Sequence, residues 1–224
     1  MLHIAIACNC QLIQKKLVAH FENKKEIKFL INASNGHDLI LQIQSLSVLP
    51  DIVFMGINMP VMDGMATTYY LKLFFPSVKV IGLSIYDDME TITYIMECGA
   101  RGYILKEEIE PALDVALSKV SNGERYIDDR AGLTEEEKNN ILINGNMEDS
   151  LLFDLTPRER TFIIFNATSL TYEQIAKTMF VETKTIHTYF DRVSKKLNLA
   201  NRQSLTLFSL QNGLAKLARY RQSA

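Results

Sequence analysis

Short apolar segments alternate with helix-like ones along the first half of the chain, and this alternation constrains the fold more than any other feature. The strand-like segments are Leu2–Ala7, Ile27–Ile31, Asp51–Met55, Val78–Leu83 and Tyr103–Leu105. Between them, apolar residues recur three or four positions apart, as Ile13, Leu17 and Phe21 do, which is typical of helices. Strands that alternate with helices form right-handed crossovers, so the pattern predicts a doubly wound parallel sheet with helices on both faces.

The last helix of this α/β domain is expected at Glu110–Ser121, because Asn122-Gly123 is a stop signal. The domain is therefore predicted to span residues 1–126. Residues 125–151 carry seven acidic residues against three basic ones, and 127–150 is interpreted as an acidic linker. Thr134 and Glu137 have the spacing of a capping box, so one short helix is predicted within the linker.

Residues 151–224 contain two strong helix start signals. Thr156 with Glu159, and Thr171 with Gln174, each have the spacing of a capping box. A turn at Phe180-Val181 is predicted to separate the second helix from a third at Thr183–Leu197. Two short helices joined by a turn indicate a helix-turn-helix.

Two stretches resemble known families. Pro50–Gly64, with the sequence PDIVFMGINMPVMDG, is similar to the centre of a receiver domain, whose usual wording is PDxVLLDxxMPxMDG. The stretch from Leu155 to Arg202 is similar to the LuxR-type domain of NarL/FixJ response regulators. The resemblance implies a five-stranded sheet of order 2-1-3-4-5 joined by a linker to an all-α four-helix domain, with the fourth helix at Gln203–Leu214.

The resemblance also implies that the receiver pocket has lost its acids. The phosphate-accepting aspartate of the family falls on Gly56, and the acidic pair after the first strand falls on Cys8 and Asn9. Glycine has no side chain to phosphorylate, and the three residues offer no carboxylate to hold magnesium. We therefore expect neither aspartyl phosphorylation nor a magnesium cofactor, and we expect Asp63 to cap a helix rather than replace the acceptor.

Three other positions match the family pocket: Ser84 as a phosphate-binding residue, Lys106 as the phosphoryl-contacting lysine and Tyr103 as the aromatic switch. In the simpler interpretation, Ser84 caps a loop, Lys106 is a remnant and Tyr103 is a core residue. In the alternative, an ammonium without its carboxylate neighbours makes the pocket electropositive. The pocket is then either locked in one conformation or occupied by an anion, a small ligand or a partner protein.

The helix at Thr183–Leu197 is expected to contact double-stranded DNA, because such helices lie in the major groove. Its candidate contact residues are Lys184, Thr185, His187, Thr188, Tyr189, Asp191, Arg192, Lys195 and Lys196. By resemblance, His187 and Thr188 fall at base-reading positions, whereas Asp191 stands where relatives often carry a lysine. Asp191 could accept a hydrogen bond from a cytosine amino group. Residues 152–224 carry 11 basic and 5 acidic residues, and this net +6 also favours DNA.

Composition argues against other classes of protein. No run of about 18 apolar residues could span a membrane, and the amino terminus lacks a secretory signal, so a cytoplasmic protein is expected. Cys8, Cys10 and Cys98 are an odd number and are expected to be reduced thiols that pack rather than bind metal. Neither a metal cluster nor a nucleophile with its base appears in the required context, so an enzyme is not expected.

Two functions remain open. In the first, the chain is a DNA-binding transcriptional regulator that acts independently of aspartyl phosphorylation, as a homodimer supported by the fourth helix. In the second, it is an orphan interaction module whose receiver binds a partner protein and whose altered helix no longer reads DNA specifically. The basic tail, 215–224, receives no role from the sequence.

Overall fold

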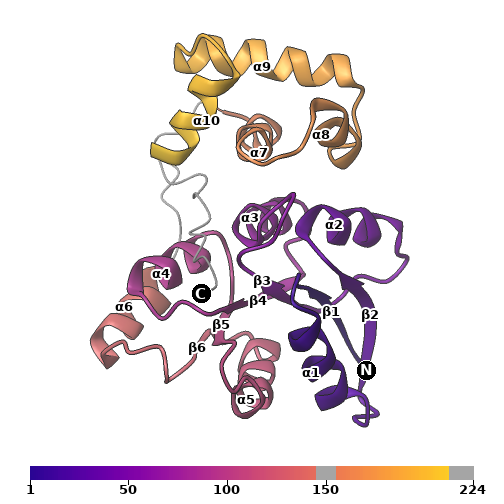
Figure 1. The fold of residues 1–224 in the computed structure, drawn as a ribbon, viewed down its shortest axis with the longest axis vertical. Coiled ribbons are helices and arrows are strands. Elements are labelled where there is room, and N and C mark those ends of the chain that lie inside the picture. Colours follow the sequence, from indigo (N-terminus) through magenta and orange to yellow (C-terminus); the bar gives the residue numbers. More distant parts are fainter. Residues whose placement is uncertain (145–154, 212–224) are drawn as a thin grey trace. The chain divides into compact units, whose positions relative to one another are not determined.

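The structure, a computed structural model, describes residues 1–144 and 155–211. The chain divides into two compact units, Met1–Glu148 and Asp149–Ala224 (Figure 1). The elements of the first unit are β1 (Leu2–Ala7), α1 (Gln11–Phe21), β2 (Ile27–Ala33), α2 (Gly36–Ser45), β3 (Ile52–Gly56), α3 (Gly64–Phe74), β4 (Lys79–Ser84), α4 (Met89–Glu97), β5 (Gly102–Leu105), α5 (Glu110–Ser121), β6 (Tyr126–Ile127) and α6 (Glu135–Asn144).

The first unit is a parallel sheet with helices on both faces, as predicted. Its strand order is β2-β1-β3-β4-β5-β6, so the predicted order 2-1-3-4-5 is confirmed and a sixth strand extends it. All strand pairs are parallel. Helices α1 and α5 cover one face, and α2, α3 and α4 cover the other (Figure 1). All five residues of the central strand β3 are buried, because both faces are covered.

Alternate residues of the strands build the core under α1 and α5. Ile4 and Ile6 of β1 and Phe54 of β3 point to this face, since side chains two positions apart in a strand share a side. Phe21, at the end of α1, stacks on Phe54 with 5.7 Å between the ring centroids. The apolar stripe that predicted α1 therefore packs on the sheet.

The loop between β3 and α3 is held against the end of the sheet by glycine. Asp63 is the N-cap of α3, as predicted, and accepts a hydrogen bond from the Ala66 amide at 2.8 Å. The next residue, Gly64, donates from its amide to the Ile57 carbonyl at 2.7 Å. A Cβ on Gly64 would lie 2.2 Å from the carbonyl oxygen of Gly56. The backbone approach is thus too close for any side chain at position 64.

The predicted linker, 127–150, needs correction. Tyr126 and Ile127 form β6, which pairs with β5, and α6 packs beside α4 with Ile141 buried. Arg125 donates to the Leu142 carbonyl at 2.8 Å, which joins α6 to the strand before it. The described part of this segment therefore belongs to the first unit. Residues 145–150 lie outside the described residues.

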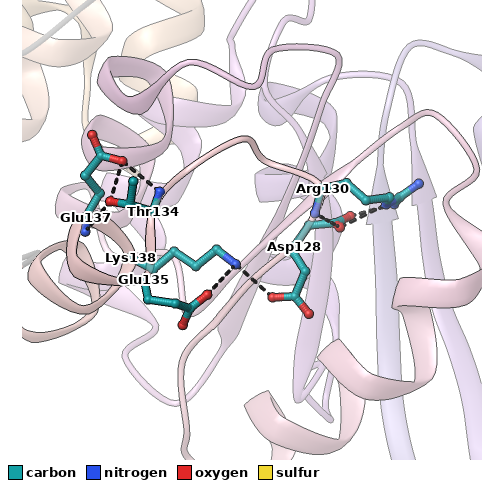
Figure 2. Close-up of polar contacts among 7 residues, drawn as sticks. Asp128, Arg130, Thr134, Glu135, Glu137 and Lys138 are labelled. Atoms are coloured by element: carbon teal, nitrogen blue, oxygen red, sulfur yellow. Dashed lines mark hydrogen bonds and ion pairs between the residues drawn. The ribbon is translucent and has the colours of Figure 1, made fainter.

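Side-chain contacts hold the segment between β6 and α6 in place (Figure 2). The capping box of Thr134 and Glu137 is confirmed: the Thr134 amide donates to Glu137 at 2.8 Å, and the Glu137 amide donates to Thr134 Oγ1 at 3.2 Å. Lys138 is almost fully buried and pairs with Asp129 at 2.9 Å and with Glu135 at 3.3 Å. Two acidic residues of the segment thus pair with Lys138, a buried cation of the same segment.

The second unit is a four-helix domain, as the resemblance implied. Its elements are α7 (Pro157–Asn166), α8 (Tyr172–Thr178), α9 (Thr183–Leu197) and α10 (Arg202–Gln211). Both predicted capping boxes are present at the starts of α7 and α8. Helix α9 packs on α7 and α8, and α10 packs on α7. Residues 212–214 of the predicted fourth helix and the tail, 215–224, lie outside the described residues.

A buried ion pair joins the ends of α7 and α9. Glu159 is 3% exposed, accepts a hydrogen bond from the Thr156 amide at 2.9 Å and pairs with Lys196 at 2.8 Å. Burial alone would raise the pKa of Glu159, but the hydrogen bonds from Lys196 and Thr156 outweigh burial, so the pKa lies below its ordinary value. The ionised form therefore stabilises the domain above the unfolded-state pKa, and this contribution is lost as the pH falls through the folded-state pKa.

Replacing Gly64 with Ala tests the close backbone approach. Because the new methyl group would meet backbone rather than a flexible side chain, we expect Gly64→Ala to lower the free energy of unfolding by about 1–3 kcal/mol or more. Urea unfolding of the full chain measures this change. Gly82→Ala, in β4, is the matched control, since its new methyl would first meet Ile95 at 3.4 Å. Equal losses in the two variants would contradict the argument.

Replacing Glu159 with Gln tests the buried ion pair, because glutamine keeps a capping oxygen but removes the charge. At pH 7 we expect Glu159→Gln to destabilise α7–α10 by about 1–2 kcal/mol. The deficit should shrink as the pH falls through the folded-state pKa of Glu159, which lies below the ordinary value of a glutamate, because the wild-type carboxylate then becomes protonated. Amide hydrogen exchange in peptides of α7–α10 measures this difference in stability between the variant and the wild type. The exposed Glu173→Gln should show no such pH-dependent deficit, and an equal deficit there would refute the role of the pair.

Candidate functional site

The six predicted pocket residues come from the carboxyl ends of neighbouring strands or the loops after them, except Tyr103, which lies within β5. Cys8 and Asn9 follow β1, Gly56 ends β3, Ser84 ends β4 and Lys106 follows β5. Because the strands are parallel, these ends meet at one edge of the sheet, which is where open α/β sheets bind ligands. The backbone amide of Lys106 donates to the Ser84 carbonyl at 2.7 Å, which joins two of these ends directly.

The space beside Gly56 is lined by sulfur and backbone. A Cβ on Gly56 would lie 3.3 Å from Cys8 Sγ and 3.4 Å from the Ala7 carbonyl oxygen. Cys8 is fully buried, and its thiol accepts from the Cys10 amide at 3.5 Å. Asn9 is exposed. The Cys8 thiol thus crowds the position where a side chain at residue 56 would begin.

Asp63 is engaged as the N-cap of α3. Its carboxylate is used to cap α3, and the pKa of Asp63 is raised because burial outweighs the hydrogen bonds from the Ala66 and Met65 amides. Its position seven residues after Gly56 places it beyond the loop, at the start of the next helix. The predicted role as an N-cap is confirmed.

Ser84 and Tyr103 contact the loop after β4. Ser84 Oγ accepts from the Tyr86 amide at 3.1 Å, and the Tyr103 hydroxyl donates to the Tyr86 carbonyl at 2.5 Å. Tyr103 is fully buried, and burial raises its pKa. The Tyr86 hydroxyl in turn accepts from Asn58 Nδ2 at 3.2 Å, in the loop after β3. Tyr103 therefore packs in the core and, through Tyr86, links the loops after β3 and β4.

The loop that carries Lys106 is held by residues that the sequence analysis did not single out. Asp128 is 2% exposed, and its carboxylate accepts from the Leu105 amide at 3.2 Å and pairs with Arg130 at 2.6 Å. Arg130 also donates to the carbonyls of Glu107 and Glu108, at 2.5 and 3.0 Å. Figure 2 shows the Asp128–Arg130 pair. The segment after β6 thereby fixes the backbone immediately after Lys106.

Lys106 is half-buried and directly follows β5 at this edge of the sheet. Within the described ranges, its ammonium makes no hydrogen bond or ion pair with a side chain. In the same residues, no group of three or more His, Cys, Asp or Glu side chains could hold a metal ion. The expectation that magnesium is not a cofactor stays a prediction.

The exposed face of α9 carries most of the candidate DNA contacts. Lys184, His187, Thr188, Asp191 and Lys195 recur at helical spacing and are exposed, as is Arg192, while Thr185 is half-buried. The opposite face, formed by Ile186 and Val193, is buried. No side-chain cap starts the helix, because its N-cap Glu182 pairs with Lys184 at 2.7 Å instead.

Two of the nine candidates make contacts within the domain. Tyr189 is 9% exposed and packs its ring 6.3 Å from that of Phe162, because it lies three residues after the buried Ile186 on the core face. Phe190, the next residue along the helix, is half-buried. Lys196 is exposed but pairs with Glu159 at 2.8 Å, and its role as a DNA contact stays a prediction. The remaining seven residues form a polar face that suits phosphate and base contacts.

Within residues 1–144 and 155–211, no helix is both long and apolar enough to cross a bilayer.

Comparison with known proteins agrees with both units. The family model of the response regulator receiver domain matches residues 4–118. The model of the bacterial regulatory proteins of the luxR family matches residues 154–209. Together the two matches include nearly every element that carries a candidate residue.

Individual relatives extend over nearly the whole chain. The oxygen regulatory protein NreC of Staphylococcus carnosus is 30% identical, over 88% of this chain and 91% of its own. The transcriptional regulatory protein DegU of Brevibacillus brevis is 25% identical, over 96% of each chain. The solved RcsB response regulator of Salmonella typhimurium shares the fold, with a TM-score of 0.53 and 19% identity over 93% of this chain and 98% of that chain.

The matched families are transcriptional response regulators and not enzymes, which agrees with the prediction from the sequence. The chain therefore belongs to the response regulators that join a receiver domain to a DNA-binding domain of the bacterial luxR family of transcriptional regulators.

Proposed function

We propose that this protein regulates transcription as a homodimer on double-stranded DNA, and that its receiver is a degenerate one that works without aspartyl phosphorylation. The observation that carries the proposal is the composition of the carboxyl edge. Gly56 ends β3, and the Cys8 thiol lies 3.3 Å from where its Cβ would be. Position 56 thus offers no carboxylate nucleophile, and the Cys8 thiol packs tightly beside it.

Phosphoryl transfer to a receiver needs both a nucleophile and a cation to balance the charge of the transferred group. Magnesium prefers oxygen ligands, chiefly carboxylates, and Cys8, Asn9 and Gly56 supply no carboxylate. Asp63 is occupied as a helix cap. The residues that remain, Ser84 and Lys106, could contact an anion but could not form an acyl phosphate.

Contacts around the pocket support a receiver held in one conformation. Arg130 binds the carbonyls after Lys106, and Tyr103 links the loops after β3 and β4 through Tyr86. Such contacts oppose the loop movements that a phosphoryl group would have to induce. The receiver then serves as a scaffold, while an anion, a small ligand or a partner protein at Lys106 is the alternative way to change its state.

DNA binding is assigned to the polar face of α9. Lys184, Arg192 and Lys195 are exposed there as phosphate contacts, with His187 and Thr188 in the amino-terminal half as base-reading residues. Asp191 makes no ion pair within the described ranges, so its carboxylate is available to accept from a cytosine amino group.

Dimer formation is assigned to α10. Leu207 of this helix is 57% exposed, which leaves an apolar side chain for a second copy. RcsB, which shares the fold, is described as two dimers bound to two parallel DNAs. A dimer of this chain would favour DNA sites with two-fold symmetry.

Selection of the unmodified full-length protein against a random DNA pool tests this function. We expect a palindromic motif that is bound with equal affinity with and without acetyl phosphate as the phosphoryl donor. Intact mass after treatment with the donor should show no acid-stable or acid-labile phosphoryl group on the receiver. Donor-dependent affinity would refute phosphorylation independence, a motif without symmetry would refute the dimer, and failure to enrich any motif would favour the interaction-module function.

Replacing Lys195 with Gln tests the polar face of α9. Each phosphate contact releases counterions, so the logarithm of affinity falls with the logarithm of salt by about 0.9 per contact. We expect Lys195→Gln to reduce this slope by about 1 and to weaken binding to all sequences alike. Lys25→Gln removes the same charge from an exposed position of the receiver and should leave the slope unchanged. Equal slopes for all three proteins would place the DNA contact elsewhere.

A further inference from the structure

A second concave site lies at the opposite edge of the sheet from Gly56. It is a pocket of about 150 Å³ where β4, β5 and β6 begin. Its lining includes four cations, Lys72, Lys79, Arg101 and Arg125, and includes neither Asp nor Glu. Neither the proposed DNA contacts nor the pocket around Lys106 uses this site.

The fold gathers these cations from separate elements. Lys79 is the first residue of β4, Arg101 directly precedes β5 and Arg125 directly precedes β6, so the parallel sheet brings all three to one edge. Lys72 comes from the last turn of α3 and crosses Gly99, whose φ is +116°. A Cβ on Gly99 would lie 2.9 Å from Cδ of Lys72, so glycine opens the path for this side chain.

Backbone carbonyls orient three of the four cations. Lys72 donates to the Glu97 carbonyl at 3.3 Å, Lys79 to the Ser121 carbonyl at 2.8 Å and Arg125 to the Leu142 carbonyl at 2.8 Å. A carbonyl fixes the direction of a cation but does not cancel its charge. Desolvation, and then repulsion from Arg101, lower the pKa of Arg125. Arg101 is exposed and makes no ion pair within the described ranges.

The size of the pocket limits the ligand. Pockets for drug-sized ligands measure about 300–1,000 Å³, so a pocket of about 150 Å³ favours a smaller ligand. One tetrahedral oxyanion with a few further atoms does fit. Guanidinium groups pair with phosphate through two parallel hydrogen bonds, and ammonium groups add point charges.

We propose that this pocket binds a phosphate group, either as inorganic phosphate or as the head of a small phosphate monoester. Arg101 and Arg125 would contact the phosphate oxygens from the starts of β5 and β6, with Lys72 and Lys79 opposite them. Because Arg125 also holds the Leu142 carbonyl of α6, the bound anion would strengthen the attachment of α6 to the sheet. Binding would stabilise the folded receiver by mass action.

Calorimetric titration of the full-length protein with sodium phosphate, at an ionic strength kept constant with sodium chloride, tests the proposal. We expect saturable binding that Arg101→Gln weakens by about tenfold or more, because one charge-assisted hydrogen bond is lost. Within the described ranges the Arg101 side chain makes no hydrogen bond or ion pair, so this variant should fold. Lys28→Gln removes one charge from an exposed position on β2 and should bind phosphate like the wild type.

Two further measurements identify which form of phosphate binds and at which edge of the sheet it binds. Methyl phosphate that binds more tightly than inorganic phosphate would identify a monoester as the ligand, and the reverse order would identify the free anion; both support the site. Heats that do not saturate, or equal affinity in the wild type and Arg101→Gln, would overturn the proposal. Loss of phosphate binding in Lys106→Gln with Arg101→Gln unaffected would also overturn it, since the anion would then occupy the opposite edge.

Discussion

A contact between two stretches of backbone determines how the carboxyl edge of the sheet is closed. Gly64 approaches Gly56 so closely that a Cβ would lie 2.2 Å from the Gly56 carbonyl. The loop after β3 therefore folds tightly over the strand end, and the Cys8 thiol fills the adjoining space. Because interiors are packed as densely as crystals, a carboxylate at position 56 would need its neighbours to move.

Local signals explain how much of the fold the sequence could predict. The limits of β1, α5 and α9 agree with the structure because apolar periodicity and end signals coincide there. β6 could not be predicted in this way, since a two-residue strand has no period. Its place depends on distant contacts, chiefly the Asp128 carboxylate with the Leu105 amide. The segment consequently looked like a linker, although it begins with the last residue of β6 and continues into α6, which packs beside α4.

The candidate functional sites could likewise be predicted only in part. Parallel strands bring Gly56 and Ser84 to one edge, so that grouping followed from the strand order. The side of α9 on which Tyr189 lies did not follow, because tyrosine suits both faces and the choice depends on the ring of Phe162 in another helix. The cations of the pocket where β4, β5 and β6 begin are separated from one another in the sequence. Only the register of β4, β5 and β6 makes them neighbours.

The shortness of β6 also affects how copies of the protein meet one another. An exposed edge strand offers a row of unpaired amides and carbonyls on which another chain can add a strand. β6 covers part of β5 but presents only two residues of its own, and Asp128 then turns its carboxylate back to the Leu105 amide. This end of the sheet thus gives a foreign strand little to pair with, whereas the longer β2 forms the edge at the other end.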